Sequence, residues 1–520
     1  MPLYGGPLDG PVQLRDMLRK GLETIPDEPA LVSMGASWTW RELDEVAERL
    51  GHNLLGLGLS AGDRVASLMP NRVHLLVHYL ACLRAGLVVT PLNYRYTAPE
   101  IDHALGVSEA AILLAHDDRA ADLAASKLAG ELPLGQIIYG GTGQSDRSFE
   151  QLLAQAPPAG GLPPPDPKAP AVIFFTSGST GAPKGVTHSF ETLGWMLACY
   201  RAVFDFSAGD IFLSGSSLSH GGGFKMSLAA LASGARVDVA EGRIGDQILP
   251  LLRETRPTLI AMLPSALFAL VRDHGAGRAD FNSVRACLCG GDKVSGELER
   301  EFTELTGLEI REVYGMTENG CATRNPISGF NKPGSVGQAS PSFTLSIRDE
   351  SGAEVPTGQE GRLWFQSPCT TIGYWNNPAA TKAAIKDGWF DSGDIMRVDE
   401  DGYLRFFGRK KQIIVHDGSN ISPQEVEDAL LEHHAVESAG VIGIHDLVHG
   451  ENVRAYITLR RGARQPTAQD LIEFARARIG YKAPEEIVVL DEMPLNPTGK
   501  VDRAALKRMA ARYAQAEMVE

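Results

Sequence analysis

A glycine- and hydroxyl-rich segment carries the clearest chemical signal in this sequence. Residues 176–185 read TSGSTGAPKG and directly follow the apolar run AVIFF. Glycines allow backbone N–H groups to come close to phosphate oxygens, the hydroxyl groups add donors, and Lys184 supplies a positive charge. Lys184 does not directly follow Gly181, so this is not the Walker pattern. By composition alone the segment is either a polyphosphate-binding loop or a flexible linker.

Six further motifs follow this loop along the chain. They are Tyr314–Glu318 (YGMTE), Gly373–Pro378 (GYWNNP), Trp389–Asp394 (WFDSGD), Gly408–Lys411 (GRKK), Gly418–Pro423 (GSNISP) with Glu427, and Pro497–Lys500 (PTGK). Together they resemble the signature motifs of the acyl-adenylate-forming (ANL) superfamily, which includes acyl-CoA synthetases, luciferases and the adenylation domains of peptide synthetases. The resemblance extends from Thr39 to Lys500, and it favours the phosphate-binding interpretation of the loop.

The resemblance implies an AMP-forming acid:CoA ligase. Such an enzyme uses ATP and Mg²⁺ to convert a carboxylic acid into an acyl-adenylate and then passes the acyl group to coenzyme A. The loop residues that would hold the phosphates are Thr176, Ser177, Gly178, Ser179, Thr180, Gly181 and Lys184. The reaction needs cations and aligned donors, because an anionic carboxylate must approach a negatively charged phosphate.

The resemblance also implies individual roles. Lys500 would bridge the carboxylate and the α-phosphate, Glu318 would hold Mg²⁺, and Thr317 would contact the α-phosphate. Asp394 would accept the ribose hydroxyls, with Arg409 at the same sugar. The alternative for Lys500 is a solvated surface charge, which is the common state of lysine.

Tyr314 and Ser392 belong to two of these motifs. Tyr314 would stack on adenine, and its alternative role is ordinary core packing. Ser392 stands where the family usually has threonine, a loss of one methyl group that is not expected to disturb Asp394.

The acid pocket is expected around residues 217–224, SLSHGGGF. His220 resembles the family residue that gates the carboxylate pocket, although a lone histidine is more often structural. Ser217 replaces a common proline, and the three glycines suggest a roomy pocket for an aromatic, alicyclic or medium-chain acid. The predicted pocket residues are His220, Gly222, Phe224, Met226, Gly290 and Gly291.

Asp205 resembles the aspartate that binds an amino acid's ammonium group in peptide-synthetase domains. It lies before the run DIFLSG, whereas the family residue follows the corresponding strand. Amino-acid activation is therefore not expected.

The family rotates its C-terminal domain between the two half-reactions. Lys411 resembles the hinge, and Gly418 would enter the site after rotation, although it could equally be a turn glycine. Arg460, Arg461 and Arg464 are candidates for coenzyme A phosphate contacts or for a solvated face. No carrier segment follows Lys500, which favours coenzyme A. Transfer to a carrier protein, luciferase-like oxidation and a non-catalytic nucleotide sensor remain alternatives.

The pattern of apolar runs predicts an α/β fold. Residues 1–409 are expected to form a large N-terminal adenylation domain with two similar α/β layers and a β-rich subdomain at about 342–408. Residues 410–520 are expected to form a small, mobile α+β domain. The proline-rich segment 157–170 reads as a connector.

Composition limits the other possibilities. The chain has 520 residues with 49 basic and 64 acidic side chains, a net charge of −15, so nucleic acid is not an expected partner. The six cysteines are too sparse for a disulfide scaffold, and Cys287 and Cys289 read as alternating strand residues. Neither an export signal nor a membrane span is expected, so the predicted location is the cytoplasm. The oligomeric state stays open, with a homodimer among the options.

Overall fold

The computed structural model describes residues 2–141, 147–157, 161–176, 183–241, 244–292, 294–416, 419–446, 450–460, 465–496 and 499–517. Internal contacts divide the chain into two units. The larger contains Met1–Leu345 and Phe365–Phe390, and the smaller contains Ser346–Trp364 and Asp391–Glu520. The domain boundary expected at residue 409 remains a prediction.

The first sheet of the large unit has seven strands. Its order is β19 (Gly373–Tyr374), β9 (Lys184–Ser189), β8 (Pro170–Thr176), β5 (Val88–Pro91), β4 (Arg64–Leu68), β6 (Ile112–His116) and β7 (Gln136–Tyr139). The strands from β8 to β7 pair in parallel, whereas β9 and β19 are antiparallel additions. Helices α3 (Val73–Arg84) and α4 (Ala98–Ser108) connect the parallel strands. Almost every residue of α3 is buried, as expected of a crossover helix in an α/β layer.

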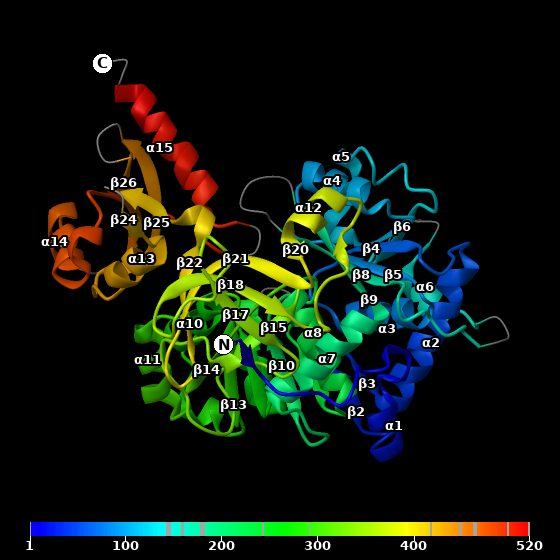
Figure 1. Cartoon of the computed structure of the whole chain (residues 1–520). Coiled ribbons are helices and arrows are strands. Elements are labelled where there is room, and N and C mark those ends of the chain that lie inside the picture. The colour runs from blue at the N-terminus through cyan, green and yellow to red at the C-terminus, as the bar shows by residue number, and fades with distance from the viewer. Residues whose placement is uncertain are drawn as a thin grey trace. The chain divides into compact units, whose positions relative to one another are not determined.

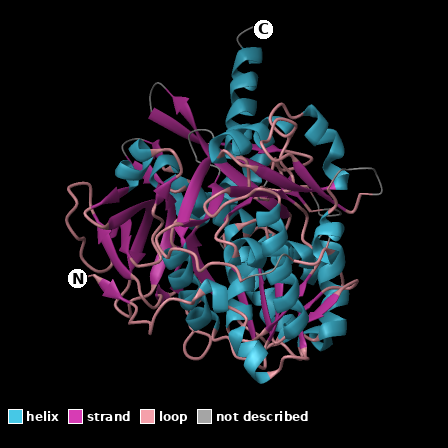
Figure 2. Ribbon diagram, turned by 90° about the vertical axis from the view of Figure 1, so that its right-hand side faces the viewer, coloured by secondary structure: helices cyan, strands magenta, loops and turns pink. Residues whose placement is uncertain are grey.

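The second sheet has nine strands and repeats this plan. Its order is β16 (Gln338–Ala339), β15 (Gly320–Arg324), β14 (Ile310–Met316), β13 (Ala286–Gly290), β12 (Leu259–Met262), β10 (Ile211–Gly215), β11 (Arg236–Val239), β2 (Pro29–Val32) and β3 (Ser37–Thr39). The strands from β14 to β2 pair in parallel. The accompanying helices are α7 (Phe190–Phe204), α8 (Gly221–Ala232), α9 (Ile244–Thr255), α10 (Pro264–Arg272) and α11 (Gly296–Thr306). The prediction of two similar α/β layers is confirmed, and Figure 2 shows helices lying against strands.

The cysteines follow the sequence expectation. Cys287 and Cys289 lie in β13, where both side chains are buried. All six cysteines are free and buried.

A third sheet forms where the sequence indicated a β-rich segment. Its strands are β1 (Leu3–Tyr4), β17 (Thr344–Arg348), β18 (Glu360–Gln366), β21 (Trp389–Val398), β20 (Ile385–Lys386) and β22 (Leu404–Arg409). Strands β21 and β22 form an antiparallel pair in which Asp394 lies opposite Arg409.

The C-terminal part of the small unit is a compact α+β fold, as predicted. Its sheet contains β24 (Ser419–Ile421), β23 (Ile414–His416), β26 (Gly450–Leu459), β25 (Val436–Asp446) and β27 (Glu486–Val489). Helices α13 (Pro423–Leu431) and α14 (Ala468–Ile479) share one apolar core with the strands, and α15 (Arg503–Glu517) contacts β25 (Figure 1). Side-chain caps at Ser422 and Thr467 begin α13 and α14. Among the described residues, no helix has both the length and the apolar character needed to cross a bilayer.

Candidate active site

The phosphate loop connects two antiparallel strands. Strand β8 ends at Thr176, which lies opposite Lys184, the first residue of β9. Ser177, Gly178, Ser179, Thr180 and Gly181 lie outside the described residues. The Lys184 ammonium lies 5.0 Å from the centre of the Tyr374 ring, a cation–π contact with β19. The exposed lysine is therefore placed beside the GYWNNP motif.

The Thr317–Glu318 turn is held by two surrounding segments, strand β9 and residues 371–374. It connects β14 to β15. His188 Nε2–H donates to the Thr317 carbonyl at 2.9 Å, and the Thr371 N–H donates to the Glu318 carbonyl at 2.7 Å. The Tyr374 hydroxyl donates to Glu318 Oε1 at 3.0 Å. These contacts fix both the backbone of the turn and the direction of the Glu318 carboxylate.

The donors at this turn are suitable for Mg²⁺. The Glu318 carboxylate and the Thr317 hydroxyl are hard oxygen ligands, and Mg²⁺ is commonly held by one or two carboxylates together with substrate phosphates.

Burial lowers the pKa of His188 to about 3, with the positive charge of Lys225 acting in the same direction. The imidazole is therefore neutral at physiological pH and can serve as the N–H donor to Thr317.

Of the three residues that support the turn, His188 and Thr371 were not predicted from the sequence, and the role of Tyr374 was not predicted. Tyr374 was visible only as a member of a motif. His188 and Thr371 had no local signal, because their contacts join residues that are far apart in the chain.

Lys225 is a buried cation next to this region. It lies in α8, its side chain is 2% exposed, and its ammonium lies 5.6 Å and 5.9 Å from the Phe174 and Tyr200 ring centres. Burial lowers its pKa to about 8, although the charge of Glu318 opposes this shift. The sequence analysis did not single out this lysine, because charged residues in apolar helices are usually on the surface.

Tyr314 lies near the end of β14, opposite Thr323 of β15. The strand pairing shifts between Tyr314 and Gly315. A Cβ atom at Gly315 would lie 1.9 Å from the Gly320 carbonyl oxygen, so only glycine permits this close strand approach. The tyrosine is partly exposed beside this irregularity.

The structure brings the two predicted ribose residues together. Arg409 Nε lies 3.3 Å from Asp394 Oδ1, and the Asp394 side chain is 3% exposed. The Ser392 hydroxyl donates to the Leu363 carbonyl at 2.7 Å and accepts the Asp394 N–H at 3.1 Å. Serine therefore supplies both hydrogen bonds that this turn uses, and the missing threonine methyl takes no part in them.

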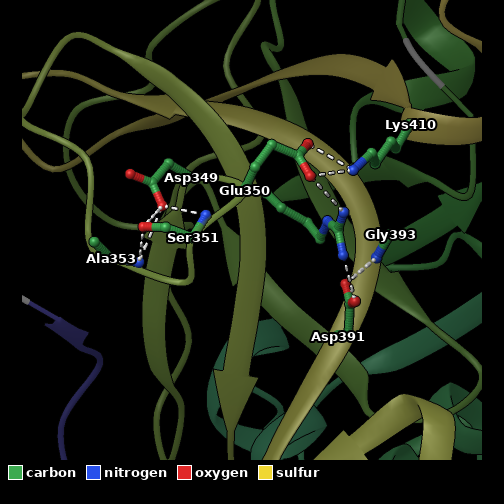
Figure 3. A network of polar contacts seen from close by, with 8 residues as sticks. Asp349, Glu350, Ser351, Ala353, Asp391, Gly393 and Lys410 are labelled. Atoms are coloured by element: carbon green, nitrogen blue, oxygen red, sulfur yellow. Dashed lines mark hydrogen bonds and ion pairs between the residues drawn. The ribbon is translucent and has the colours of Figure 1, made fainter.

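A chain of polar contacts continues from this turn (Figure 3). The Gly393 N–H donates to Asp391 at 3.0 Å, and Arg362 donates to the same carboxylate at 2.8 Å. Arg362 also pairs with Glu350 at 3.7 Å, and Glu350 binds Lys410 at 2.5 Å. The chain of contacts thus ends at the residue before Lys411. The Lys411 side chain and Gly418 lie outside the described residues.

The predicted pocket residues occupy different environments. His220 is exposed and caps α8, with Nδ1 accepting the Gly222 N–H at 3.5 Å. A Cβ at Gly222 would meet His220 and Met226 at an ordinary 3.8 Å. A Cβ at Gly223 would lie 2.3 Å from the Ser217 carbonyl oxygen, so this glycine serves backbone packing. Only part of the triple glycine therefore bears on pocket size.

Of three further pocket candidates, Phe224 is buried in the core, Gly290 is half-buried and Gly291 is exposed. The buried Phe224 ring packs 4.7 Å from Tyr79 and 5.2 Å from Phe174, measured between ring centres. Gly290 lies against Val313, where a Cβ would come within 2.6 Å of the carbonyl oxygen. Gly291 has a φ of +83° that favours glycine.

Asp205 has a structural position. It caps the C-terminal end of α7 with a φ of +48°, and its carbonyl accepts a hydrogen bond from Arg285 at 2.6 Å.

Lys500 lies in a short hairpin of the small unit between β27 and α15. The Asn496 N–H donates to the Lys500 carbonyl at 2.7 Å, and the Lys500 N–H donates to Asn496 Oδ1 at 3.1 Å. Leu495 and Val501 form a β-bridge at the base of the hairpin. Pro497 and Thr498 lie outside the described residues. The backbone on both sides of Lys500 is therefore tied to Asn496.

Of the three candidate coenzyme A arginines, Arg460 lies among the described residues. Arg460 Nε donates to the Val436 carbonyl at 3.0 Å, whereas Arg461 and Arg464 lie outside the described residues. This contact gives Arg460 a structural function.

Comparison with known proteins extends over nearly the whole chain. Residues 18–375 match the AMP-binding enzyme family, and residues 425–500 match the AMP-binding enzyme C-terminal domain. A feruloyl-CoA synthase from Amycolatopsis sp is 32% identical, covering 93% of this chain and 96% of the relative. A medium-chain fatty-acid–CoA ligase from Escherichia coli strain K12 is 31% identical, covering 96% and 90%.

A solved structure gives the same result. The anthranilate CoA ligase AuaEII, in complex with anthranoyl-AMP, superposes with a TM-score of 0.89 at 25% identity, covering 99% of each chain. This agreement includes both the large N-terminal domain and the small C-terminal domain, so it confirms the predicted fold class and the predicted family. The chain belongs to the AMP-binding enzyme family, the acyl-adenylate-forming superfamily.

Proposed function

We propose that this protein is an ATP-dependent carboxylic acid:CoA ligase. The observation that carries the proposal is the similarity to acid:CoA ligases over more than nine-tenths of the chain. A solved relative that holds an acyl-adenylate supports the proposed intermediate. The residues needed for acid activation are present in this chain at Lys500, Glu318 and Asp394.

The first half-reaction forms the adenylate. A carboxylate oxygen of the acid attacks the α-phosphorus of ATP, a P–O bond forms, and pyrophosphate leaves. Lys500 bridges the two reacting anions, Thr317 contacts the α-phosphate, and the loop with Lys184 holds the outgoing phosphates. Mg²⁺ bound at Glu318 would neutralise phosphate charge. Tyr314 stacks on adenine, while Asp394 and Arg409 hold the ribose.

The second half-reaction uses the thiol of coenzyme A. Its sulfur attacks the carbonyl carbon of the adenylate, AMP leaves, and a thioester forms. We propose that the C-terminal domain rotates about Lys411 between the steps, withdrawing Lys500 and bringing Gly418 to the thiol path. Rotation resolves the conflict between a closed, cationic site for the phosphoryl step and an open path for a long thiol.

The proposed acid is aromatic, alicyclic or of medium chain length. Relatives named for ferulate, anthranilate and medium-chain acids support this range. Gly222 lies beside His220 and Met226, where an added Cβ would make ordinary contacts, and we propose that its missing side chain widens the acid pocket. His220 is proposed to stand at the carboxylate end of the pocket, with Phe224, Gly290 and Gly291 among its walls.

Two further proposals concern the setting of the enzyme. Six reduced cysteines fit a cytoplasmic location. A homodimer is the proposed assembly, which sedimentation of the purified protein would test.

The decisive assay is ATP–pyrophosphate exchange with a panel of carboxylic acids. Exchange that depends on one acid class identifies the adenylation step and the substrate together. Coenzyme A, a phosphopantetheinylated carrier protein and oxygen are then offered separately to the preformed adenylate. An acyl-CoA product supports the proposal, whereas acyl transfer to the carrier alone would reassign the acceptor.

A further inference from the structure

The Lys500 hairpin needs an anchor to the body of the small unit. Asn496 fixes the shape of the hairpin but belongs to the same loop, so its hydrogen bonds do not determine where Lys500 stands. The residues that follow Lys500 do make contacts with the body of the unit. They contact β25 and α13, which are parts of the unit's framework.

The first contact is a close packing of Val501 on β25. A Cβ atom at Gly440 would lie 2.7 Å from Val501 Cγ1 and 2.8 Å from Leu506 Cδ1. Glycine at this position therefore leaves a notch in the strand that receives both side chains. The notch sets the distance of the hairpin from the sheet.

The second contact is a partly buried ion pair between Arg503, whose side chain is 25% exposed, and the buried Glu427. Arg503 Nη2 donates to Glu427 Oε1 at 2.6 Å and to Oε2 at 2.7 Å. Glu427 Oε1 also accepts the Val441 N–H at 2.7 Å, and the Glu427 side chain is 6% exposed. The guanidinium three residues after Lys500 is thus tied to α13 and β25 at once.

The net contribution of this ion pair to the free energy of unfolding is expected to be small. Arg503 Nε is buried and has no hydrogen-bond partner among the residues that the structure describes. Removing two charges from water offsets much of their attraction, and well-packed apolar residues often stabilise a fold as well. A planar guanidinium that holds a fixed carboxylate, however, restricts direction as well as distance.

We propose that the Glu427–Arg503 pair is a positioning device that sets the place of Lys500 for adenylate formation. The inference rests on the proposed function, because it assigns the adenylation step to Lys500. Arg503 acts through the backbone of residues 500–503 and is a positioning residue. The thioester step, which does not use Lys500, is independent of the pair.

The test compares two half-reactions in full-length variants. Arg503→Met keeps the aliphatic stem and removes the charge. It is expected to slow ATP–pyrophosphate exchange by about 10- to 10²-fold, the scale of a displaced reacting group. Thioester formation from supplied acyl-adenylate and coenzyme A is expected to stay within about twofold of the wild type, since Lys500 takes no part in that step.

Arg454→Met is the matched control. Arg454 forms an ion pair with Glu486 between β26 and β27 of the same unit. The control is expected to leave both half-reactions unchanged. Arg503→Lys, which keeps the charge but loses the planar guanidinium, is expected to recover part of the exchange rate.

Stability is measured in parallel to separate positioning from folding. Glu427→Gln serves as a second route to the same break if Arg503→Met fails to fold. Hydrogen exchange in peptides covering residues 495–501 is expected to speed up in the Arg503 and Glu427 variants and not in the Arg454 control. Equal loss of both half-reactions in a folded variant would overturn the inference. An unchanged rate of ATP–pyrophosphate exchange in Arg503→Met would overturn it as well. Absence of exchange in the wild type with every acid would instead contradict the proposed function.

Discussion

The Thr317–Glu318 turn and the Lys500 hairpin are both short loops that carry a proposed catalytic side chain, but they are supported differently. The turn is held by three residues from two segments of the large unit, His188 of β9 and both Thr371 and Tyr374 of the stretch 371–374. The hairpin is tied to its unit through Val501 and one ion pair. A turn that is held by hydrogen bonds from both segments should tolerate the loss of one of them. A hairpin whose described contacts with its unit include a single ion pair should be more sensitive to the loss of that pair.

The largest expected effect is the loss of the Lys500 ammonium itself. Lys500→Ala should slow adenylation by about 10²-fold or more, the scale for removing one preorganised electrostatic group. Thioester formation from supplied acyl-adenylate should remain. Stopped-flow or radiolabel assays of the separate half-reactions measure both. Equal losses in both would show that Lys500 is not specific to the first step.

The next effect is expected at the turn's own reactive group. Glu318→Gln keeps the shape and an acceptor oxygen but removes the charge that would attract Mg²⁺. Adenylation should fall by about 30- to 10²-fold, and the Mg²⁺ concentration for half-maximal rate should rise. Titrating MgCl₂ at fixed ATP measures this shift. An unaltered Mg²⁺ requirement would remove Glu318 from the metal site.

A single brace of the turn should matter much less. Tyr374→Phe keeps the ring beneath Lys184 and deletes only the hydrogen bond to Glu318. The typical net contribution of one hydrogen bond, about 0.5–1.5 kcal/mol, predicts a fall of about 3- to 10-fold in adenylation, with a small rise in the Mg²⁺ requirement. A loss as large as that of Glu318→Gln would contradict the view that the braces are redundant.

The smallest effect concerns the pH dependence of the hairpin anchor. Burial raises the pKa of Glu427 to about 7, although the Arg503 charge opposes the shift. The folded state then holds this proton more tightly than the unfolded chain does. The contribution of Glu427 to the free energy of unfolding should therefore fall as pH rises from about 4.5 to about 7.

The free energy of unfolding of the small unit, measured by urea titration at several pH values, tests this expectation. Glu427→Gln should flatten the pH dependence over that interval, while Glu486→Gln, at an exposed side chain, should leave it in place. The same slope in wild type and Glu427→Gln would show that this carboxyl does not titrate in the interval.

The sequence predicted the elements better than the contacts. Alternating apolar runs and helical patterns identify parallel α/β layers because each run must be buried between helices. Motif order identified Glu318, Asp394 and Lys500, and the structure adds that Asp394 meets Arg409 across β21 and β22.

The supports of these residues could not be predicted in the same way. Tyr374 reaches Glu318 and His188 reaches Thr317 only after distant strands are placed side by side. A roomy pocket was inferred from three consecutive glycines. One of them, Gly223, faces backbone atoms, so its missing side chain is required by backbone packing. Lys225 shows the same limit, because a lysine in an apolar helix gives no sequence signal that it is buried next to two aromatic rings.

The most direct test of the account is acid-dependent ATP–pyrophosphate exchange by the wild-type chain and Lys500→Ala, measured side by side with aromatic and medium-chain acids. We expect the wild-type chain to catalyse exchange that requires both Mg²⁺ and a particular acid, and the variant to lose this activity by about 10²-fold. Exchange that persists in folded Lys500→Ala, or a wild type that exchanges with no acid, would contradict the claim that this chain forms acyl-adenylates through Lys500.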